Sequence, residues 1–379
     1  MNVPKLRFKE FDDEWDYKIF DELINIKSES YNPSLNKENY KCIELEHINQ
    51  NTGTINGYCN SQDQKSNKNI FKKNEVLFGK LRPYLKKYWY ATFDGVCSSE
   101  IWVGKSKDQN IVTNKFIYDL FQSHYFLQLC NLSTGSKMPR ADWPFIKEQS
   151  IAIPNILEQK KISETLELLD KKIELQSKKV EDLKLFKLYS KNLILNNYEY
   201  KCKLKDILIK WNKKNKDNSI KYVESISNKY GFIAQSDQFE DRNVASKNLK
   251  NYYVIEKGVF GYNPSRLNVG SLALKINNNI SVVSPLYECF TTTQNKEYLL
   301  EWFDSKYFRK ETITKFEGGV RNTLNFSNLC EIEIGLPSKE KQNKYAYFFK
   351  NFNNKIEIET NKLNKLIELK KGLMQNMFV

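Results

Sequence analysis

The sequence predicts an α/β (α+β) protein built from two similar globular segments, each followed by a long helix. Three observations support this prediction: a long internal repeat, a helical hydrophobic seam in each copy, and short apolar runs between turn residues. A chain of 379 residues is long enough for two such units. Because 40% of its residues are hydrophobic and 13% are aromatic, each copy can bury a core of its own.

The two seams show the repeat most clearly. In each seam, apolar residues step alternately by 4 and 3 positions. Each member of the first seam has a counterpart in the second that lies 183 residues later, and the same offset separates Pro154 from Pro337. We call this the repeat offset. A narrow stripe with a period of 3.5 is typical of a helix that lies along a partner helix. We therefore predict an antiparallel coiled coil with a pseudo-two-fold internal repeat, paired through Ile162, Leu166, Leu169, Ile173, Val180, Leu183, Tyr345, Phe349, Phe352, Ile356, Leu363 and Leu366.

One polar position interrupts each seam. Gln176 lies in the first seam, and Glu359 is its counterpart in the second at the repeat offset. A buried polar position in a coiled coil can set its register, whereas a polar residue at a frayed edge has no such role. Both interpretations are compatible with the sequence.

The globular segments share an order of elements. Buried strands are predicted at 76–79 and 259–262, helices at 114–131 and 296–311, and last strands at 151–153 and 332–336. A proline and the long helix follow each last strand. The predicted ranges are 1–157 for the first globular segment, 158–196 for the first helix, 197–337 for the second segment and 338–379 for the second helix.

The charge balance favours a polyanionic partner. The net charge is +14, and the two helical ranges carry only +2 and +5 of it, so the globular segments hold the remaining +7. Nucleic acid is the first expectation and an anionic membrane surface the second. A general enrichment in lysine is the alternative explanation.

Cysteine and histidine usage excludes some classes of site. The seven cysteines form no C-x-x-C pair, so we expect reduced thiols in a cytoplasmic protein rather than a disulfide framework or a zinc ribbon. With only His47 and His124, a histidine-rich metal centre is excluded. The first residues contain no apolar signal core, and no run of about 18 apolar residues predicts a membrane span.

Several strings, in this order and partly twice over, resemble the specificity subunit of type I restriction-modification systems. They are Val3-Pro4-Lys5-Leu6-Arg7-Phe8 with Trp15, Phe78-Gly79-Lys80-Leu81-Arg82-Pro83-Tyr84, Gly135-Ser136 ahead of Ile151-Ala152-Ile153-Pro154, and Glu158-Gln159-Lys160-Lys161-Ile162 with Leu169-Asp170-Lys171-Lys172-Ile173. The second copy departs from the last pair, with Lys341-Gln342-Asn343-Lys344-Tyr345 and Phe352-Asn353-Asn354-Lys355-Ile356. The resemblance covers nearly the whole chain.

This resemblance implies a DNA-binding function without catalysis. The globular segments would be target recognition domains that each read one half of a bipartite duplex site, with the helices as spacers. The helices would also dock two methyltransferase subunits, and through them restriction subunits. S-adenosylmethionine, ATP and magnesium would be bound by these partners, for DNA adenine methylation and cleavage, and no cofactor by this chain.

Basic residues that follow the buried strands are the candidates for DNA contact. Lysine and arginine contact phosphates, while arginine and lysine read guanine and asparagine and glutamine read adenine. Arg82, Arg140, Arg266 and Arg321 stand out, because a guanidinium can make bidentate contacts. Any single lysine could instead be a solvated surface charge. The full set is Lys80, Arg82, Tyr84, Lys86, Lys87, Ser136, Lys137, Arg140, Tyr262, Asn263, Ser265, Arg266, Lys315, Arg321 and Asn322.

Two alternative functions remain open. A coiled-coil scaffold with two protein-binding heads would have the same repeat, and a stand-alone DNA methyltransferase would also bind DNA. Asn263-Pro264-Ser265-Arg266 lacks the second proline and the aromatic ring of an adenine methyltransferase motif, and no G-x-x-x-x-G-K-[ST] loop predicts ATP hydrolysis. No metal or catalytic residues are predicted.

Overall fold

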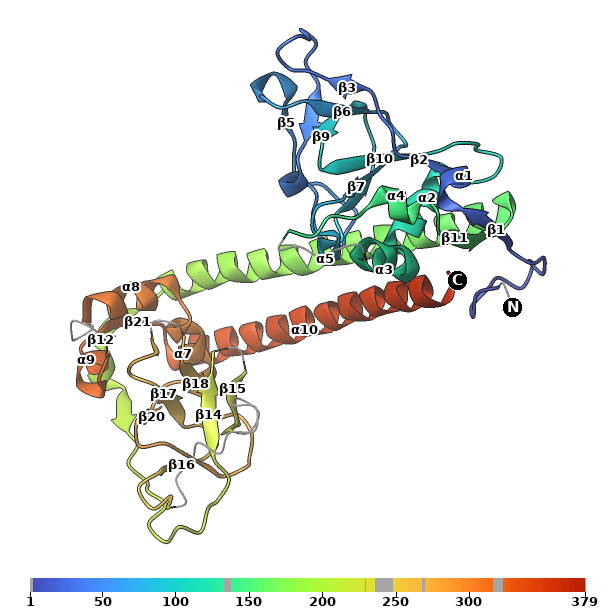
Figure 1. The fold of residues 1–379 in the computed structure, drawn as a ribbon. Helices are drawn as coiled ribbons and strands as arrows, with labels where there is room; N and C mark the ends of the chain where they lie inside the picture. Colours follow the sequence, from blue (N-terminus) through green and yellow to red (C-terminus); the bar gives the residue numbers. More distant parts are fainter. Residues whose placement is uncertain are drawn as a thin grey trace. The chain divides into compact units, whose positions relative to one another are not determined.

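The computed structural model describes residues 3–132, 138–228, 230–235, 248–267, 270–315 and 323–378. Its two longest helices are α5 (Ile156–Asn196) and α10 (Lys339–Asn376), drawn in green and red in Figure 1. Contacts divide the chain into two compact units, Met1–Ser177 with Asn361–Val379, and Lys178–Thr360. Each unit therefore joins one globular segment to a part of both helices, a grouping that differs from the four sequential ranges suggested by the sequence.

Each globular segment contains a four-stranded antiparallel sheet of the same strand order. In the first segment the order is β2 (Ile24–Asn25), β10 (Ile101–Ser106), β7 (Val76–Gly79) and β8 (Tyr88–Tyr90). In the second segment it is β13 (Leu208–Lys210), β20 (Glu288–Thr292), β17 (Phe260–Tyr262) and β18 (Leu272–Leu274). The predicted buried strands are thus the third strands of matching sheets, and the prediction of two similar α/β segments is confirmed.

A separate strand pair joins the beginning and end of each segment. β1 (Asp16–Ile19) runs antiparallel to β11 (Ser150–Ile153), and β12 (Tyr200–Lys203) runs antiparallel to β21 (Glu333–Leu336). Since β11 and β21 directly precede the long helices, this pairing fixes where each helix leaves its segment.

The remaining sheets have diverged between the repeats. The first segment has a five-stranded sheet in the order β3 (Ser30–Tyr31), β6 (Lys68–Phe71), β9 (Gly95–Ser98), β4 (Lys41–Ile43) and β5 (Cys59–Asn60). The second has two pairs, β14 (Glu224–Ser227) with β15 (Gly231–Ala234) and β16 (Tyr253–Ile255) with β19 (Ser281–Val283). A parallel bridge from Val223 to Val282 corresponds to the parallel β4–β9 pair.

The structure is helical over the predicted ranges 114–131 and 296–311, but each range is divided into two helices. The helices are α2 (Asn114–Gln122) with α3 (His124–Leu132), and α7 (Lys296–Phe303) with α8 (Lys306–Lys315). A serine accounts for both breaks. The Ser123 hydroxyl accepts the backbone N–H of Phe126 at 3.2 Å, and the Ser305 hydroxyl accepts that of Phe308 at 3.1 Å, so each serine starts a new helix.

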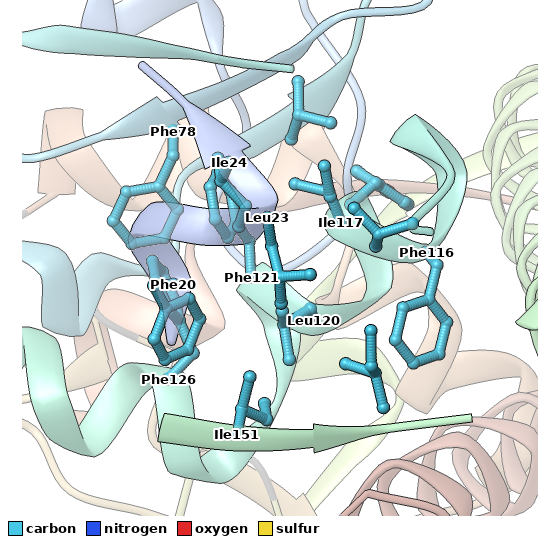
Figure 2. Close-up of a cluster of buried hydrophobic side chains, with 14 of the residues drawn as sticks. Phe20, Leu23, Ile24, Phe78, Phe116, Ile117, Leu120, Phe121, Phe126 and Ile151 are labelled. Atoms are coloured by element: carbon cyan, nitrogen blue, oxygen red, sulfur yellow. The ribbon is translucent and has the colours of Figure 1, made fainter. Parts of the chain in front are cut away.

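Short helices complete the segments: α1 (Phe20–Leu23), α4 (Trp143–Ile146) and α9 (Phe326–Cys330). The core of the first segment lies between β7, α1, α2 and α3, where Phe78, Phe121 and Phe126 gather (Figure 2). The rings of Phe121 and Phe126 stack with centroids 4.4 Å apart. Such aromatic packing contributes about 0.5–1.5 kcal/mol per pair beyond the buried area.

Within each unit the α5 and α10 segments run antiparallel, as predicted. In the second unit Lys179 pairs with Glu359 at 3.1 Å, and Phe186 stacks on Phe352 with centroids 5.3 Å apart, so the partner number falls as the α5 number rises. In the first unit Lys370 pairs with Asp170 at 2.6 Å. All twelve apolar seam residues are buried or half-buried.

The polar seam residue Glu359 is also buried, and its ion pair with Lys179 crosses from α10 to α5. It therefore does not lie at a frayed edge, and a paired buried charge of this kind can favour one register. No helix in the described ranges has an apolar stretch long enough to span a membrane.

Candidate nucleic-acid interface

The first basic cluster of the first segment forms the connection between β7 and β8. Residues 80–87 leave the buried strand, turn through a short 3-10 helix at Pro83–Leu85, and return so that the N–H of Gly79 donates to the carbonyl of Lys87 at 2.8 Å. Arg82 and Lys86 flank this turn with φ of 54° and 51°. Non-glycine residues in the left-handed region are uncommon and carry a cost, and such strain gathers at functional sites.

The second basic cluster lies directly beside the first. Leu81 and Arg140 form a β-bridge, the N–H of Arg82 donates to the carbonyl of Pro139 at 2.7 Å, and the N–H of Ala141 donates to the carbonyl of Lys80 at 2.9 Å. Two stretches far apart in sequence therefore form one surface. Ser136 and Lys137, which the sequence assigns to the same cluster, lie outside the described residues.

The side chains of this surface differ in how free they are. Arg82, Tyr84 and Lys86 are exposed, and neither Arg82 nor Lys86 has a side-chain ion pair within the described part of the chain. Arg140 is held by Glu100 through two hydrogen bonds of 3.0 and 3.2 Å, and this hydrogen bonding raises the pKa of Arg140. Arg82 and Lys86 are therefore the groups most available to an anionic ligand, whereas Arg140 is pre-positioned by an acid.

Lys80 and Lys87 are less accessible to a ligand than Arg82 and Lys86. Both are half-buried, and the Lys87 ammonium group donates to the carbonyl of Leu45. Because that donor is already used, Lys87 fixes the neighbouring 44–58 connection to the turn rather than pointing freely to solvent.

The second segment brings the corresponding stretches together in the same way. After β17, the Asn263 side chain accepts the N–H of Ser265 at 3.0 Å, which closes a turn that leaves Ser265 and Arg266 exposed. The N–H of Leu324 donates to the carbonyl of Pro264 at 3.1 Å, so the chain that follows 316–322 returns to this turn. Arg321 and Asn322 themselves lie outside the described residues.

Two predicted residues of the second segment are placed differently. Tyr262 is completely buried in the core, and its hydroxyl donates to the carbonyl of Leu324 at 3.1 Å. The prediction that Tyr262 contacts DNA is therefore wrong, because Tyr262 is the last residue of β17 and its side chain lies in the core. Burial also raises the pKa of the Tyr262 hydroxyl. Lys315 is the half-buried last residue of α8, and its charge helps to lower the pKa of Glu331, which Lys203 lowers more through a hydrogen bond.

Sequence reasoning missed an amide-bearing loop beside the first surface. The N–H of Asn51 donates to the carbonyl of Lys86 at 2.9 Å, and Gln50 forms a β-bridge with Lys87. Both side chains are exposed, and asparagine and glutamine are the residues that best read adenine. Gly53 lets this loop lie close to the core, because its φ is +69° and a Cβ there would lie 1.9 Å from the Tyr118 hydroxyl.

A buried glutamine positions the helices in both repeats. The Gln159 side chain donates to the carbonyls of Ile111 and Pro154 and accepts the N–H of Thr113, at 2.8–3.1 Å. Gln342, its counterpart at the repeat offset, donates to the carbonyl of Pro337 and accepts the N–H of Asn295, at 3.0 and 3.1 Å. Each glutamine thereby ties the beginning of a long helix to the residue that caps α2 or α7.

The neighbouring Glu158 is specific to the first repeat. Its carboxylate accepts hydrogen bonds from Nε and Nη2 of Arg7, each at 2.8 Å, and from the indole N–H of Trp15 at 3.2 Å. The Glu158 side chain is 1% exposed. The hydrogen bond that Arg7 donates to Glu158 is the main cause that raises the pKa of Arg7. Arg7 and Trp15 therefore fix the beginning of α5 to the start of the chain.

Comparisons with known proteins agree with this duplicated architecture. The model of the type I restriction modification DNA specificity domain matches residues 12–185 and again residues 196–369. The chain belongs to this family. The two matches together cover most of the chain and repeat at the spacing of the two globular segments.

Relatives of the type I specificity family support the assignment. The type I restriction enzyme EcoDI specificity subunit of Escherichia coli is 27% identical over 158 residues, which is 41% of this chain. The match spans about a third (34%) of that relative's length.

Solved structures share the fold. The type I restriction-modification S subunit from M. genitalium matches with a TM-score of 0.63 and 15% identity, over 100% of this chain and 99% of that one. A chain from a study of complex assembly and conformational transition of the type I R-M system matches with a TM-score of 0.59 and 14% identity, over 95% and 96%.

Proposed function

We propose that this chain is the DNA-specificity subunit of a type I restriction-modification complex and that each globular segment reads one half of a bipartite duplex target. The observation that carries the proposal is the joined surface in each repeat: Arg82 beside Arg140 in one, and Arg266 beside the chain that leads to Leu324 in the other. Each surface follows the third strand of a matching sheet, so one recognition scaffold is used twice.

The side chains on these surfaces fit a division of labour between affinity and specificity. Lys86 is a flexible ammonium suited to phosphate, whereas Arg82 and Arg266 have the planar geometry that suits guanine. Gln50 and Asn51 add adenine-reading amides in the first segment only. Because the two surfaces carry different residues, the two half-sites would differ in sequence.

The helices would dock the methyltransferase subunits. One pair of exposed apolar side chains, Leu175 and Ile358, recurs at the repeat offset, and both are more than half exposed. Apolar side chains left in solvent at equivalent positions fit two copies of one partner. This assignment places partner contacts on the outer faces of α5 and α10 and DNA contacts on the globular segments.

In this proposal the chain itself performs no chemistry. Its methyltransferase partners would bind S-adenosylmethionine and modify adenine, and restriction subunits would use ATP and magnesium to cleave, all in the cytoplasm. Among the residues that the structure describes, no group of three or more histidine, cysteine and acidic side chains could hold a metal ion. That finding is compatible with a recognition role.

Duplex binding at increasing salt tests the proposal in the assembled complex. A subunit that makes several phosphate contacts should lose about 10³–10⁵ in affinity between 50 and 200 mM salt. Affinity that stays flat would favour a protein-binding scaffold instead. S-adenosylmethionine retained by the isolated chain would favour a methyltransferase.

A further inference from the structure

Cys42 and Cys59 face each other across two strands at the edge of the five-stranded sheet. They are direct partners in the antiparallel β4–β5 register, and β5 is the outermost strand. The Cys59 thiol donates to the Cys42 carbonyl at 3.5 Å, and both side chains lie in one buried cluster. We propose that these two cysteines are a reversible thiol–disulfide site of the first globular segment.

The backbone geometry suits such a bond. Residues directly opposite in an antiparallel pair have Cα atoms about 4.5–5.5 Å apart, and disulfides span Cα distances of about 4.4–6.8 Å. Both side chains lie in one small cluster with Tyr31, Val96 and Ile70. The sulfurs can therefore join through side-chain rotation and a small approach of an edge strand.

The two thiols differ in access, and this difference orders the reaction. Cys59 is half-buried and accepts a hydrogen bond from the Gln64 amide at 3.3 Å, whereas Cys42 is completely buried. Burial raises the pKa of the Cys42 thiol, so Cys59 is the group that an oxidant from solvent meets first.

A peroxide would be the oxidant. It converts the Cys59 thiol to a sulfenic acid and is itself reduced to water. The Cys42 sulfur then attacks the Cys59 sulfur, the S–O bond breaks, and the oxygen leaves as a second water. The Cys42 proton leaves with this oxygen as part of the water, and a thiol reductant reverses the bond.

A third cysteine nearby serves as an internal control. Cys97 lies on β9, where Val96 and not Cys97 is the partner of Cys42. Since neighbouring residues of a strand point to opposite faces, Cys97 packs in a different cluster with Ile43 and Leu77. The second repeat has no equivalent pair: Cys202 and Cys289 face Ile334 and Gly261, and Cys330 lies on α9.

The disulfide would restrain a segment that supports the candidate interface. It would close the connection between β4 and β5, which holds the turn through Asn51 and through the Lys87 bond to Leu45. Resting on the proposed function, we infer that oxidation changes recognition of the first half-site and leaves the second unaffected.

Thiol mapping of the full-length chain tests the site itself. The protein is treated with hydrogen peroxide, blocked with an alkylating agent, digested and analysed by mass spectrometry. We expect a linked Cys42–Cys59 peptide that a thiol reductant removes, and Cys97 recovered as a free thiol. Cys59→Ser should abolish the linked peptide without unfolding the protein, because the residue is half-buried and the change is small.

Two outcomes would overturn the site: Cys59 recovered as sulfinic or sulfonic acid with Cys42 free, or either cysteine linked elsewhere. Duplex binding by the complex then tests the consequence, with oxidised Cys59→Ser as control. The inference is supported if oxidised and reduced protein bind the duplex with different affinity and if this difference depends only on the sequence of the first half-site. Equal affinity of the two forms rejects it. If the reduced complex binds no duplex at all, the proposed function fails while the mapped disulfide stands.

Discussion

Asp119 and Glu301 occupy the same position of α2 and α7, counted from the N-cap residues Thr113 and Asn295, but among the described residues only Glu301 forms ion pairs with lysine. Glu301 is held by Lys187 at 2.8 Å and Lys191 at 2.7 Å, both on α5. Asp119 is completely enclosed, and one of its carboxylate oxygens has no hydrogen-bond partner. At the repeat offset, the counterpart of Lys191 is Met374, which has no charge to offer.

The missing lysine predicts an unusual pH dependence of stability. Burial is the main cause that raises the pKa of Asp119 to about 7, and Ser163 and the charges of Lys115 and Lys370 oppose it only in part. The folded state therefore binds a proton more tightly than the unfolded state. The free energy of unfolding should fall on the order of 2 kcal/mol as pH rises from about 5 to 7, and not change further above the folded pKa.

Asp119→Asn tests this prediction, because the amide has nearly the same shape and no charge. Thermal unfolding should show a stabilisation near pH 8 that shrinks markedly near pH 5. Asp182→Asn, an exposed change on α5, should show no such difference. A gain of equal size at both pH values would contradict the buried-carboxyl explanation.

Glu301→Gln should have the opposite pH dependence. Burial opposes the charge of Glu301, but Lys191 and Lys187 outweigh it and its pKa is lowered. The stabilisation is therefore present above the unfolded pKa and is lost as pH falls through the folded pKa. At neutral pH the variant should lose about 1–3 kcal/mol, because Lys187 loses its carboxylate partner and Lys191 keeps only its ion pair with Asp304 at 2.8 Å. Denaturant unfolding beside the exposed Glu297→Gln control measures this loss, and near-equal stability of the two variants would reject the assignment.

The two arginine surfaces should act on different half-sites. Arg82→Ala and Arg266→Ala should each weaken duplex binding by the assembled complex by about 1–3 kcal/mol. Competition between duplexes altered in one half-site at a time should show relaxed discrimination in one half for Arg82→Ala and in the other half for Arg266→Ala. Arg309→Ala, an exposed change on α8, is the control. If both variants lost discrimination in the same half-site, the proposal that each globular segment recognises its own half-site would be contradicted.

Partner docking should depend on the exposed apolar pair Leu175 and Ile358 of the helices. Leu175→Glu should weaken binding of one methyltransferase subunit at least about tenfold, as expected for the loss of a buried anchor at an interface. The double variant with Ile358→Glu should weaken both. Light scattering on the purified complex counts the subunits. Leu157→Glu is a matched control, since its counterpart at the repeat offset is already Glu340.

Much of the fold could be predicted because periodicity and repetition report burial directly. The apolar steps of the seams predict that Leu166 and Phe349 are buried, as they are, and the strand at 76–79 is entirely buried, as its apolar composition indicates. The breaks at Ser123 and Ser305 could not be separated from helix interiors, because a serine can lie in a helix or cap one.

The site was predictable in outline but not in detail. Basic residues after a buried strand indicated the surface, but Tyr262 ends the strand inside the core, and the sequence pattern carried no sign of that. Glu158 and Arg7 are far apart in the sequence, and a contact at such a separation leaves no local signal. Gln159 and Gln342 could have been suspected, since a glutamine recurs at the repeat offset at the start of each long helix.

Exchange of residues 197–337 for the same segment of a relative with a different target tests the central claim most directly. Methylated adenines are then mapped in cells that carry the intact system. The account predicts that one half of the methylated site changes to that of the donor while the other half stays as it was. A change in both halves, or in neither with the complex still active, would contradict a chain in which each repeat reads its own half of the target.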